Sequence, residues 1–401
     1  MGGPVRASAS FLFQSSKAVL CALGSSAHVG RNVLEQLRVP PKSAGAAAWL
    51  GHKAGTVLVV SDKGITSRGL ELKCCEDLAR HGYEVVLYDD VVADPPEQVV
   101  LDAVALAKEV RASCVVGFGG GSSLDVAKLV ALLAHPHAKQ QLKEVYGVGA
   151  CAGERLPLVQ VPTTAGTGSE VTPIAIVTTG ASEKKGVVSP LLLPDLAVLD
   201  GELTATLPAA VTAATGVDAM VHAIEAYTSR LKKNPLSDLL AREALRLLGA
   251  RIRTVCREPG NLEARSDMLL GSMYAGMSFA NAPVAAVHAL AYPIGSHFHV
   301  PHGLSNALML PHVLRFNEPV VGDLYAEIAP ILFPGRRGAL PDLFEELAAD
   351  LKMPRTLREV GIADKDLELL AGEAMKQTRL LPNNPREVLR EDAEKLYALA
   401  L

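Results

Sequence analysis

A carboxylate and an imidazole stand one helical turn apart at Asp218 and His222. Side chains at i and i+4 lie on one face of a helix, so these two can hold a single divalent cation between them. Further donors follow downstream, where five of the chain's 11 histidines fall within about 25 residues: His288, His297, His299, His302 and His312. One carboxylate oxygen with imidazole nitrogens suits Fe²⁺ or Zn²⁺ and disfavours Ca²⁺ or Mg²⁺, which prefer oxygen ligands. The same spacing also occurs in ordinary helices, so it does not establish a metal site by itself.

Two polar segments follow consecutive predicted strands upstream. Gly119, Gly120 and Gly121 separate a predicted strand over residues 114–118 from a helix that begins near Leu124. Glycines let the backbone approach a pyrophosphate, and the N-terminus of the following helix offers free N–H groups to the anion. The segment is not the GxGxxG fingerprint of a standard Rossmann site, and a tight connection is the alternative interpretation.

The second segment covers residues 162–172 and is rich in hydroxyl groups. It contains four threonines and one serine: Thr163, Thr164, Thr167, Ser169 and Thr172. Such side chains can bond a ribose, a phosphate or a nicotinamide amide, although a helix cap or turn also uses them. Because both segments follow strands of one α/β domain, a dinucleotide site is the better interpretation.

The elements that must position these residues change in character near residue 200. Short apolar runs predict strands over residues 10–14, 18–21, 56–60, 83–88, 114–118, 158–161 and 196–199. From residue 56 onward, helical patterns lie between the predicted strands. This alternation is typical of parallel βαβ units. Longer periodic segments then predict helices over 208–231, 235–257, 263–280 and 304–316, with breakers at Pro235, Pro259, Pro283, Pro293 and Pro301. The sequence therefore predicts an α/β nucleotide-binding domain over 1–203 and an all-α metal-binding domain over 204–401.

Composition narrows the class of protein. The chain has 401 residues, 49% of them apolar, and a net charge of −4 without a basic run, so neither the charge nor its distribution favours nucleic-acid binding. The sequence contains no stretch of 18 uncharged apolar residues, so it predicts no membrane span. Six cysteines without a CxxC pair favour a reducing, cytoplasmic location. The first 34 residues lack acidic side chains, as transit peptides do, so a mitochondrial location stays open.

Taken together, these motifs resemble the iron-containing (group III) alcohol dehydrogenase family. The resemblance extends from about Phe11 to the C-terminus, and rests on the glycine segment with Asp125 and Lys128, the segment 162–172, and the four residues Asp218, His222, His288 and His302. It implies the dehydroquinate synthase-like architecture, with an α/β domain, a helical domain and a cleft between them. It also implies that these four residues are the metal ligands.

The resemblance assigns the cofactor-binding residues as well. It implies that the dinucleotide contacts Asp62, Gly119, Gly120, Gly121, Ser122, Asp125, Thr163, Thr164, Thr167 and Ser169. A lysine near the nicotinamide matches Lys184 or Lys185, and we take Lys185. Several family members carry a histidine four residues after the third metal ligand, where this chain has Tyr292. A tyrosine there is expected to be catalytic by donating a proton or stacking on the nicotinamide ring.

The predicted function is a metal-dependent oxidoreductase that passes hydride between a nicotinamide cofactor and a small alcohol, aldehyde or ketone. Asp62 follows a strand where α/β domains read the adenosine ribose, which favours NAD over NADP. Fe²⁺ is the expected ion and Zn²⁺ the alternative, and a homodimer is the expected assembly. A hydroxyacid–oxoacid transhydrogenase and a maleylacetate-type reductase remain open, as does a non-catalytic binding protein. Glu225, three residues past His222, is expected either to orient that imidazole or to face solvent.

Overall fold

The computed structural model describes residues 26–29, 55–180 and 183–401, and these divide into two compact units. The first unit runs to Thr163 and resumes over Ser169–Leu203, and the second comprises Thr164–Gly168 and Thr204–Leu401. The chain therefore passes from one unit to the other after Leu203, and a short earlier segment between Thr163 and Ser169 also groups with the second unit.

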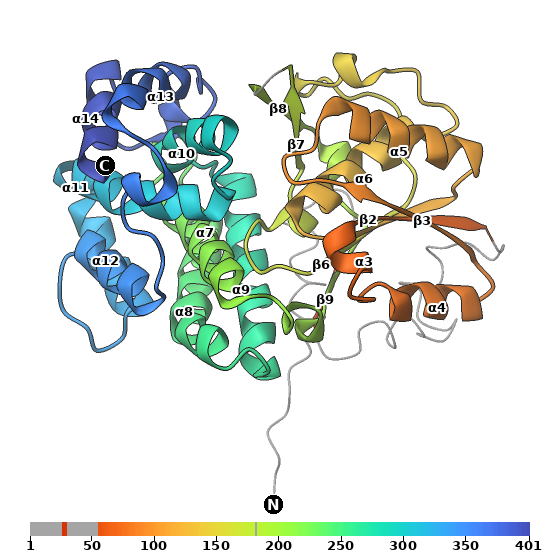
Figure 1. The fold of residues 1–401 in the computed structure, drawn as a ribbon, viewed down its shortest axis with the longest axis horizontal. Coiled ribbons are helices and arrows are strands. Elements are labelled where there is room, and N and C mark those ends of the chain that lie inside the picture. The colour runs from red at the N-terminus through yellow and green to blue at the C-terminus, as the bar shows by residue number, and fades with distance from the viewer. Residues whose placement is uncertain (1–25, 30–54, 181–182) are drawn as a thin grey trace, which may run out of the picture. The chain divides into compact units, whose positions relative to one another are not determined.

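A six-stranded parallel sheet forms the centre of the first unit (Figure 1). Its strands, in the order β1-β9-β6-β4-β2-β3, are β1 Ser26–Val29, β9 Leu196–Leu199, β6 Leu158–Pro162, β4 Cys114–Gly119, β2 Thr56–Asp62 and β3 Glu84–Val91. Five of them match predicted strands, whereas the predicted strands over 10–14 and 18–21 lie outside the described residues.

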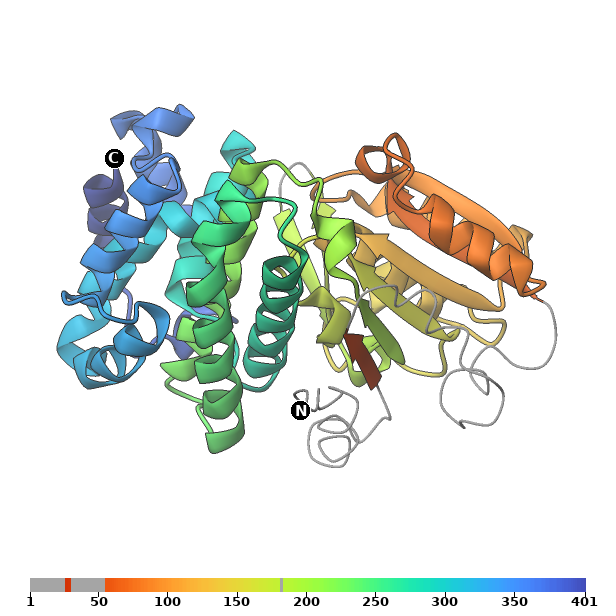
Figure 2. The same ribbon diagram turned by 90° about the horizontal axis from the view of Figure 1, so that it is seen from below.

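Helices cover both faces of this sheet, which explains why its strands are continuously apolar in sequence. On one face, Leu58 and Val60 of β2 pack with α5 (Glu97–Glu109) and α6 (Gly121–Leu133). On the other face, Val57 and Val59 pack with α4 (Leu72–Arg80). Figure 1 shows α5 and α6 on one side of the sheet, and Figure 2 shows α4 in front of the strands. Because alternate residues of a strand point to opposite faces, both sets must be apolar.

A small second sheet lies in the same unit and was not predicted. Its order is β5-β8-β7, with β7 (Ile174–Thr179) and β8 (Glu183–Val188) antiparallel and β5 (Gly147–Val148) beside β8. The residues of β8 are mostly half-exposed, so the strand lacks the apolar run that marks a buried strand in sequence.

The second unit is built from helices. They are α7 Ala209–Tyr227, α8 Pro235–Arg257, α9 Leu262–Asn281, α10 Ala286–Phe298, α11 His302–Leu332, α12 Leu340–Asp350, α13 Leu367–Ala374 and α14 Arg390–Ala400. Helices α7, α8 and α9 pack side by side (Figure 2), and α11 packs on α7, α10 and α12. Helix α7 is apolar and buried along most of its length, as expected for the central helix of a bundle. None of the described helices combines the length and apolar character that a membrane span requires.

Proline marks most helix boundaries as predicted, with one error. Pro235 is the first residue of α8, where the side chain of Asn234 accepts hydrogen bonds from the backbone N–H groups of Leu236 and Ser237. Pro293, however, lies inside α10 rather than at its end. An internal proline costs about 3 kcal/mol, but most of α10 is buried against its neighbours, and tertiary packing decides whether a short helix forms.

Candidate metal and cofactor sites

Three of the four predicted metal ligands converge inside the helical unit. Asp218 lies on α7, His288 on α10, and His302 is the first residue of α11. The Asp218 Oδ1 atom lies 3.7 Å from His288 Nε2 and 3.6 Å from His302 Nε2. One donor atom from each residue lies within 4.8 Å of the other two, and both Asp218 and His288 are buried. Three helices far apart in sequence thus bring a carboxylate and two imidazoles to one point.

The fourth predicted ligand, His222, lies beside this set but outside it. Its ring stacks on His288, with centroids 4.7 Å apart, and on Phe279, with centroids 4.4 Å apart. Burial lowers the pKa of His222 from 6.5 to about 3. The ring is therefore neutral near pH 7, which is the state in which imidazole binds a metal ion. Phe279 was not predicted, and no spacing pattern in the sequence distinguishes it from a core residue.

Hydrogen bonds set the tautomers of two of the histidines. His222 Nδ1 donates to the Gly166 carbonyl oxygen at 3.2 Å, and His288 Nδ1 donates to Glu225 Oε2 at 2.6 Å. In each ring the proton then lies on Nδ1, so the Nε2 lone pair can bind a cation. Glu225 is also fixed, because its Oε1 accepts the Val287 backbone N–H at 2.7 Å. The expectation that Glu225 orients His222 or faces solvent was wrong, since this buried carboxylate orients His288.

Asn306 binds all three converging residues and was missed from the sequence. Its Nδ2 lies 2.6 Å from Asp218 Oδ1, 3.2 Å from His288 Nε2 and 3.3 Å from His302 Nε2. The side chain is fully buried, and its Oδ1 has no hydrogen-bond partner among the described residues. A signal was available, since Asn306 stands four residues after His302 and so on the same helix face.

The donor set fits a divalent transition ion. Three lone pairs, one on an anionic oxygen and two on imidazole nitrogens, point at the same N–H₂ group, so they are already directed at one electropositive centre. One carboxylate with imidazoles is a ligand combination that Fe²⁺ and Zn²⁺ accept. Asp218, His288 and His302 would therefore hold such an ion, with His222 as the adjacent fourth ligand.

A glycine brings the N-terminus of α11 close to α7. A Cβ atom on Gly303 would lie 2.4 Å from the Ala214 carbonyl oxygen and 3.3 Å from the Asp218 Cβ. Real Cβ atoms do not approach so closely, so only glycine allows this packing of the two helices. The close approach is what places His302 beside Asp218.

Tyr292 lies next to the same ligands. It follows His288 by four residues on α10, and its ring centroid is 6.5 Å from that of His288 and 5.7 Å from that of His302. The helix predicted from this spacing is present, and the phenol ring contacts the edge of the ligand set. Its catalytic role stays a prediction.

In the α/β unit, several of the predicted cofactor residues lie at the carboxyl ends of neighbouring strands. Asp62, Gly119 and Pro162 end the adjacent strands β2, β4 and β6. The Thr163 backbone N–H donates to the Gly119 carbonyl at 2.9 Å, and Ser123 Oγ donates to Asp62 Oδ2 at 3.1 Å. From β2 the chain continues to β3 on one side of the sheet, whereas from β4 it continues to β6 and β9 on the other side. The direction in which strands are added therefore reverses between β2 and β4. Open α/β sheets bind ligands at such a reversal, beyond the carboxyl ends of the strands.

The glycine segment forms a cradle at this reversal point. Gly119 has φ +153°, and a Cβ there would lie 2.7 Å from Ser123 Oγ and 3.2 Å from Asp62 Oδ2. Gly120 caps α6, and Gly121 and Ser122 form its first turn, where backbone N–H groups are free of helical partners. These features fit a dinucleotide phosphate, because the bare backbone permits close approach and the helix N-terminus attracts an anion.

Asp125 and Ser169 belong to a buried network behind this cradle. Ser169 Oγ donates to Asp125 Oδ1 at 2.6 Å, and the fully buried Lys128 Nζ donates to Ser169 Oγ at 2.7 Å and to the Ile174 carbonyl at 2.6 Å. Asp125 Oδ2 also accepts the Ile176 backbone N–H at 2.9 Å. These hydrogen bonds tie β7 and the turn after β6 to α6. Asp125 and Ser169 therefore hold these segments in position beside the glycine cradle.

The other predicted cofactor residues are divided between the units. Thr163 belongs to the α/β unit, whereas Thr164 and Thr167 belong to the helical unit. Lys184 and Lys185 are neighbours on β8. The Lys184 side chain is nearly buried, with its Nζ 2.6 Å from Asp94 Oδ1, whereas Lys185 is half-exposed and 3.5 Å from Glu183. The choice of Lys185 stays a prediction.

Comparison with known proteins finds matches over both units. Residues 41–201 match the family described as iron-containing alcohol dehydrogenase, and residues 212–401 match the C-terminal part of the Fe-containing alcohol dehydrogenase family. The chain is 39% identical to long-chain-alcohol dehydrogenase 1 of Geobacillus thermodenitrificans over 383 residues, covering 93% of this chain and 94% of that protein.

Solved structures show the same similarity. That of a 1,3-propanediol oxidoreductase has a TM-score of 0.85 and 32% identity, covering 94% of this chain and 97% of that one. That of sulfoacetaldehyde reductase from Bifidobacterium kashiwanohense, in complex with NAD⁺, has a TM-score of 0.82 and 26% identity, covering 95% of this chain and 98% of the other. With matches over both units, a buried carboxylate–imidazole set and a glycine cradle at the sheet edge, this chain belongs to the iron-containing alcohol dehydrogenase family.

Proposed function

We propose that this protein is an NAD(H)-dependent oxidoreductase that interconverts small alcohols and aldehydes or ketones at a single Fe²⁺ or Zn²⁺ ion. The observation that carries the proposal is the convergence of Asp218, His288 and His302 from three helices, with Nδ1 of His288 already engaged by Glu225. Relatives named for alcohol oxidation or aldehyde reduction support the same reaction class, among them a lactaldehyde reductase of Escherichia coli that is 32% identical.

Each residue of the ligand set has a separate task. When bound, the ion would act as a Lewis acid on the substrate oxygen, and the nicotinamide would supply the hydride chemistry. Asp218 contributes the single negative charge of the proposed ligands, so the ion and these ligands together would keep a net positive charge. Glu225 orients His288, and the Gly166 carbonyl orients His222. In both rings Nε2 is then the nitrogen that would bind the ion. Asn306 donates to Asp218 Oδ1, which has a further lone pair for the ion.

The sheet edge of the α/β unit is the proposed NAD site. We assign the pyrophosphate to Gly119, Gly120, Gly121 and the first turn of α6, and the adenosine ribose to Asp62. The Asp62 carboxylate is fixed by Ser123 and can accept hydrogen bonds from ribose hydroxyls, whereas it repels a 2′-phosphate. The solved relative in complex with NAD⁺ supports this choice of cofactor. The expected homodimer and the cytoplasmic or mitochondrial location stay predictions.

Tyr292 is the proposed proton-handling residue at the edge of the ligand set. Replacing it by Phe removes the hydroxyl but keeps the ring beside His302. Tyr292→Phe is therefore expected to lower the turnover rate and change its pH profile while the content of bound ion stays at the wild-type value. An unchanged pH profile with full turnover would show that the hydroxyl takes no part.

A reconstitution assay tests the function as a whole. The protein is stripped with a chelator, reloaded with Fe²⁺ or Zn²⁺, and assayed with a panel of alcohols, aldehydes and oxo acids, with NAD(H) and NADP(H). We expect no activity in the stripped protein, and recovery at about one ion per chain with free NAD⁺ and a simple alcohol. Full activity without the ion contradicts the proposal. Exchange between a hydroxy acid and an oxo acid without free nicotinamide would instead support a transhydrogenase, and a strict need for an unsaturated dicarboxylate would support a maleylacetate-type reductase.

A further inference from the structure

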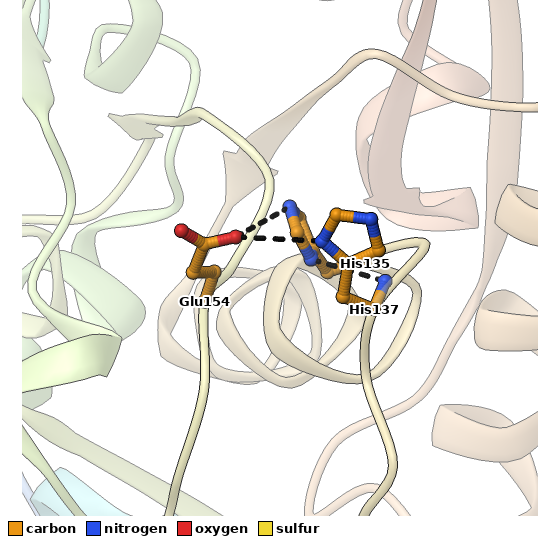
Figure 3. Close-up of side chains that lie close together, drawn as sticks. All are labelled: His135, His137 and Glu154. Carbon is orange, nitrogen blue, oxygen red and sulfur yellow. Dashed lines mark hydrogen bonds and ion pairs between the residues drawn. The ribbon is translucent and has the colours of Figure 1, made fainter.

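A second group of side chains with metal-ligand chemistry lies in the α/β unit, and none of its residues belongs to the sites described above. His135 and His137 stand in the turn after α6, and Glu154 lies in the loop that leads to β6 (Figure 3). The Glu154 Oε2 atom is 3.8 Å from His135 Nε2 and 3.7 Å from His137 Nδ1, and the three donor atoms lie within 4.8 Å of one another. We propose that these three residues form a surface site for a divalent transition ion, separate from the catalytic one.

The two loops that carry these residues are fastened to each other. The Gln140 side chain donates from Nε2 to the Ala150 carbonyl at 2.8 Å, and its Oε1 accepts the Ala152 backbone N–H at 2.7 Å. This pair of bonds joins the loop after His137 to the loop before Glu154. The donors on the two loops are thus held near each other before any ion binds, which lowers the conformational entropy lost on binding.

Arg155, the residue after Glu154, is held by several hydrogen bonds. The Arg155 guanidinium donates to the carbonyls of Leu191 at 2.8 Å and Leu193 at 2.7 Å, and it pairs with Asp195. The backbone at Glu154 therefore has a fixed neighbour, while its own side chain remains 73% exposed and able to turn toward the histidines. His135 is the least exposed of the three, at 17%, and His137 is the most exposed, at 82%.

The donor chemistry selects the class of ion. Two imidazole nitrogens and one carboxylate oxygen suit Zn²⁺, Ni²⁺ or Cu²⁺, with water completing the coordination, and suit Mg²⁺ and Ca²⁺ poorly. His135 also stands two residues beyond the last residue of α6, Leu133. The carboxyl end of a helix carries a partial negative charge, so a cation is favoured there.

Binding requires a small adjustment. Two ligands of tetrahedral Zn²⁺, each at about 2.0–2.1 Å, stand roughly 3.3 Å apart. The two distances from Glu154 to the histidines, 3.8 and 3.7 Å, must therefore shorten by about 0.4–0.5 Å. The His137 backbone N–H lies 3.3 Å from His135 Nδ1, which must carry the ring proton once Nε2 binds an ion. That N–H must therefore turn away. The exposed side chains of His137 and Glu154 have room to make these changes.

The proposed site goes beyond the proposed catalytic function and does not depend on it. An ion held by His135, His137 and Glu154 would link the loop after α6 to the loop before β6, since these residues come from both. We expect bound Zn²⁺ to raise the melting temperature of the protein without a change in its steady-state rate.

Metal counting tests the proposal on the full chain. Protein already loaded with one equivalent of Zn²⁺ is titrated with further Zn²⁺, and bound metal per chain is measured at equilibrium. We expect a second equivalent in the wild type, and at least a tenfold weaker second binding step in His137→Ala and in Glu154→Gln. His81→Ala removes an exposed histidine elsewhere in the same unit and serves as the matched control, with wild-type binding expected. With Cu²⁺ in place of the added Zn²⁺, the paramagnetic resonance spectrum should show two nitrogen ligands at the second site.

Two results would overturn the site. One is the failure of wild-type protein to take up a second ion, and the other is equal second binding by the wild type, His137→Ala and Glu154→Gln. Both variants leave the proposed catalytic ligands intact, so the first equivalent and the enzymatic rate should match the wild type. Loss of activity upon metal removal concerns the catalytic proposal alone, and the two tests can therefore fail independently.

Discussion

At the scale of single residues, the site depends on groups that never touch the proposed ion. Glu225 is buried and accepts hydrogen bonds from both His288 Nδ1 and the Val287 backbone N–H. Glu225→Gln keeps the shape but removes the charge and one of the two acceptor oxygens. We expect metal affinity to fall about 10- to 100-fold, because the imidazole loses the partner that fixes its tautomer and raises its basicity.

Competition with a chelator of known affinity measures this change directly. Glu318→Gln, an exposed glutamate on α11, is the matched control and should bind metal like the wild type. If Glu225→Gln and Glu318→Gln retain the ion equally well, the carboxylate does not act through His288.

Cofactor choice depends on one carboxylate at the end of β2. Asp62 lies beside the glycine cradle, where a 2′-phosphate would bring nearly two negative charges toward its own. Two unit charges about 4 Å apart near a surface interact by roughly 4 kcal/mol before screening. Asp62→Gly is therefore expected to raise kcat/KM with NADPH relative to NADH. Comparable use of both cofactors by the wild type would show that Asp62 does not read the ribose.

At the scale of elements, glycine decides how closely helices approach. Gly303→Ala places a methyl group 2.4 Å from the Ala214 carbonyl oxygen, so α11 must move away from α7. Overpacking of this kind costs typically about 1–3 kcal/mol, and here it also separates His302 from Asp218. We expect a lower melting temperature together with reduced metal content. Gly322→Ala on the same helix, where the nearest atom to the new methyl is 3.7 Å away, should show neither effect.

At the scale of the whole molecule, a buried acid links stability to pH. Burial raises the pKa of the Glu170 carboxyl from 4.5 to about 7, and its Oε1 has no partner among the described residues. The folded state therefore holds a proton more tightly than the unfolded state. The stabilisation that comes from protonated Glu170 is fully present below pH 4.5 and is lost as the pH rises to about 7. Over that range the free energy of unfolding falls by about 3 kcal/mol.

Glu170→Gln removes this pH dependence, because an amide stays neutral. The free energy of unfolding of the variant, relative to the wild type, should therefore increase between pH 5 and pH 8. Denaturant unfolding at several pH values measures the difference. A constant difference across that range would mean that Glu170 is ionised to the same extent in the folded and unfolded states.

The sequence by itself determined the classes of element and the residue types available for chemistry. Strands buried on two faces must be apolar without interruption, so Thr56–Asp62 and Cys114–Gly119 were recognisable, and an apolar period that begins at the breaker Pro235 identified α8. These are local signals, because the side-chain period and the proline breakers lie within a few consecutive residues. Spacing on one helix likewise paired Asp218 with His222, and an i, i+4 step tied Tyr292 to His288.

Only the tertiary structure decided which distant side chains meet. Glu225 follows His222 closely in sequence, yet its carboxylate reaches His288, 63 residues away. Asn306 contacts Asp218 across 88 residues, and α10 continues through Pro293 because its residues are buried against other helices. Such contacts depend on helix packing, here on the glycine that lets α11 approach α7, and no local pattern encodes them.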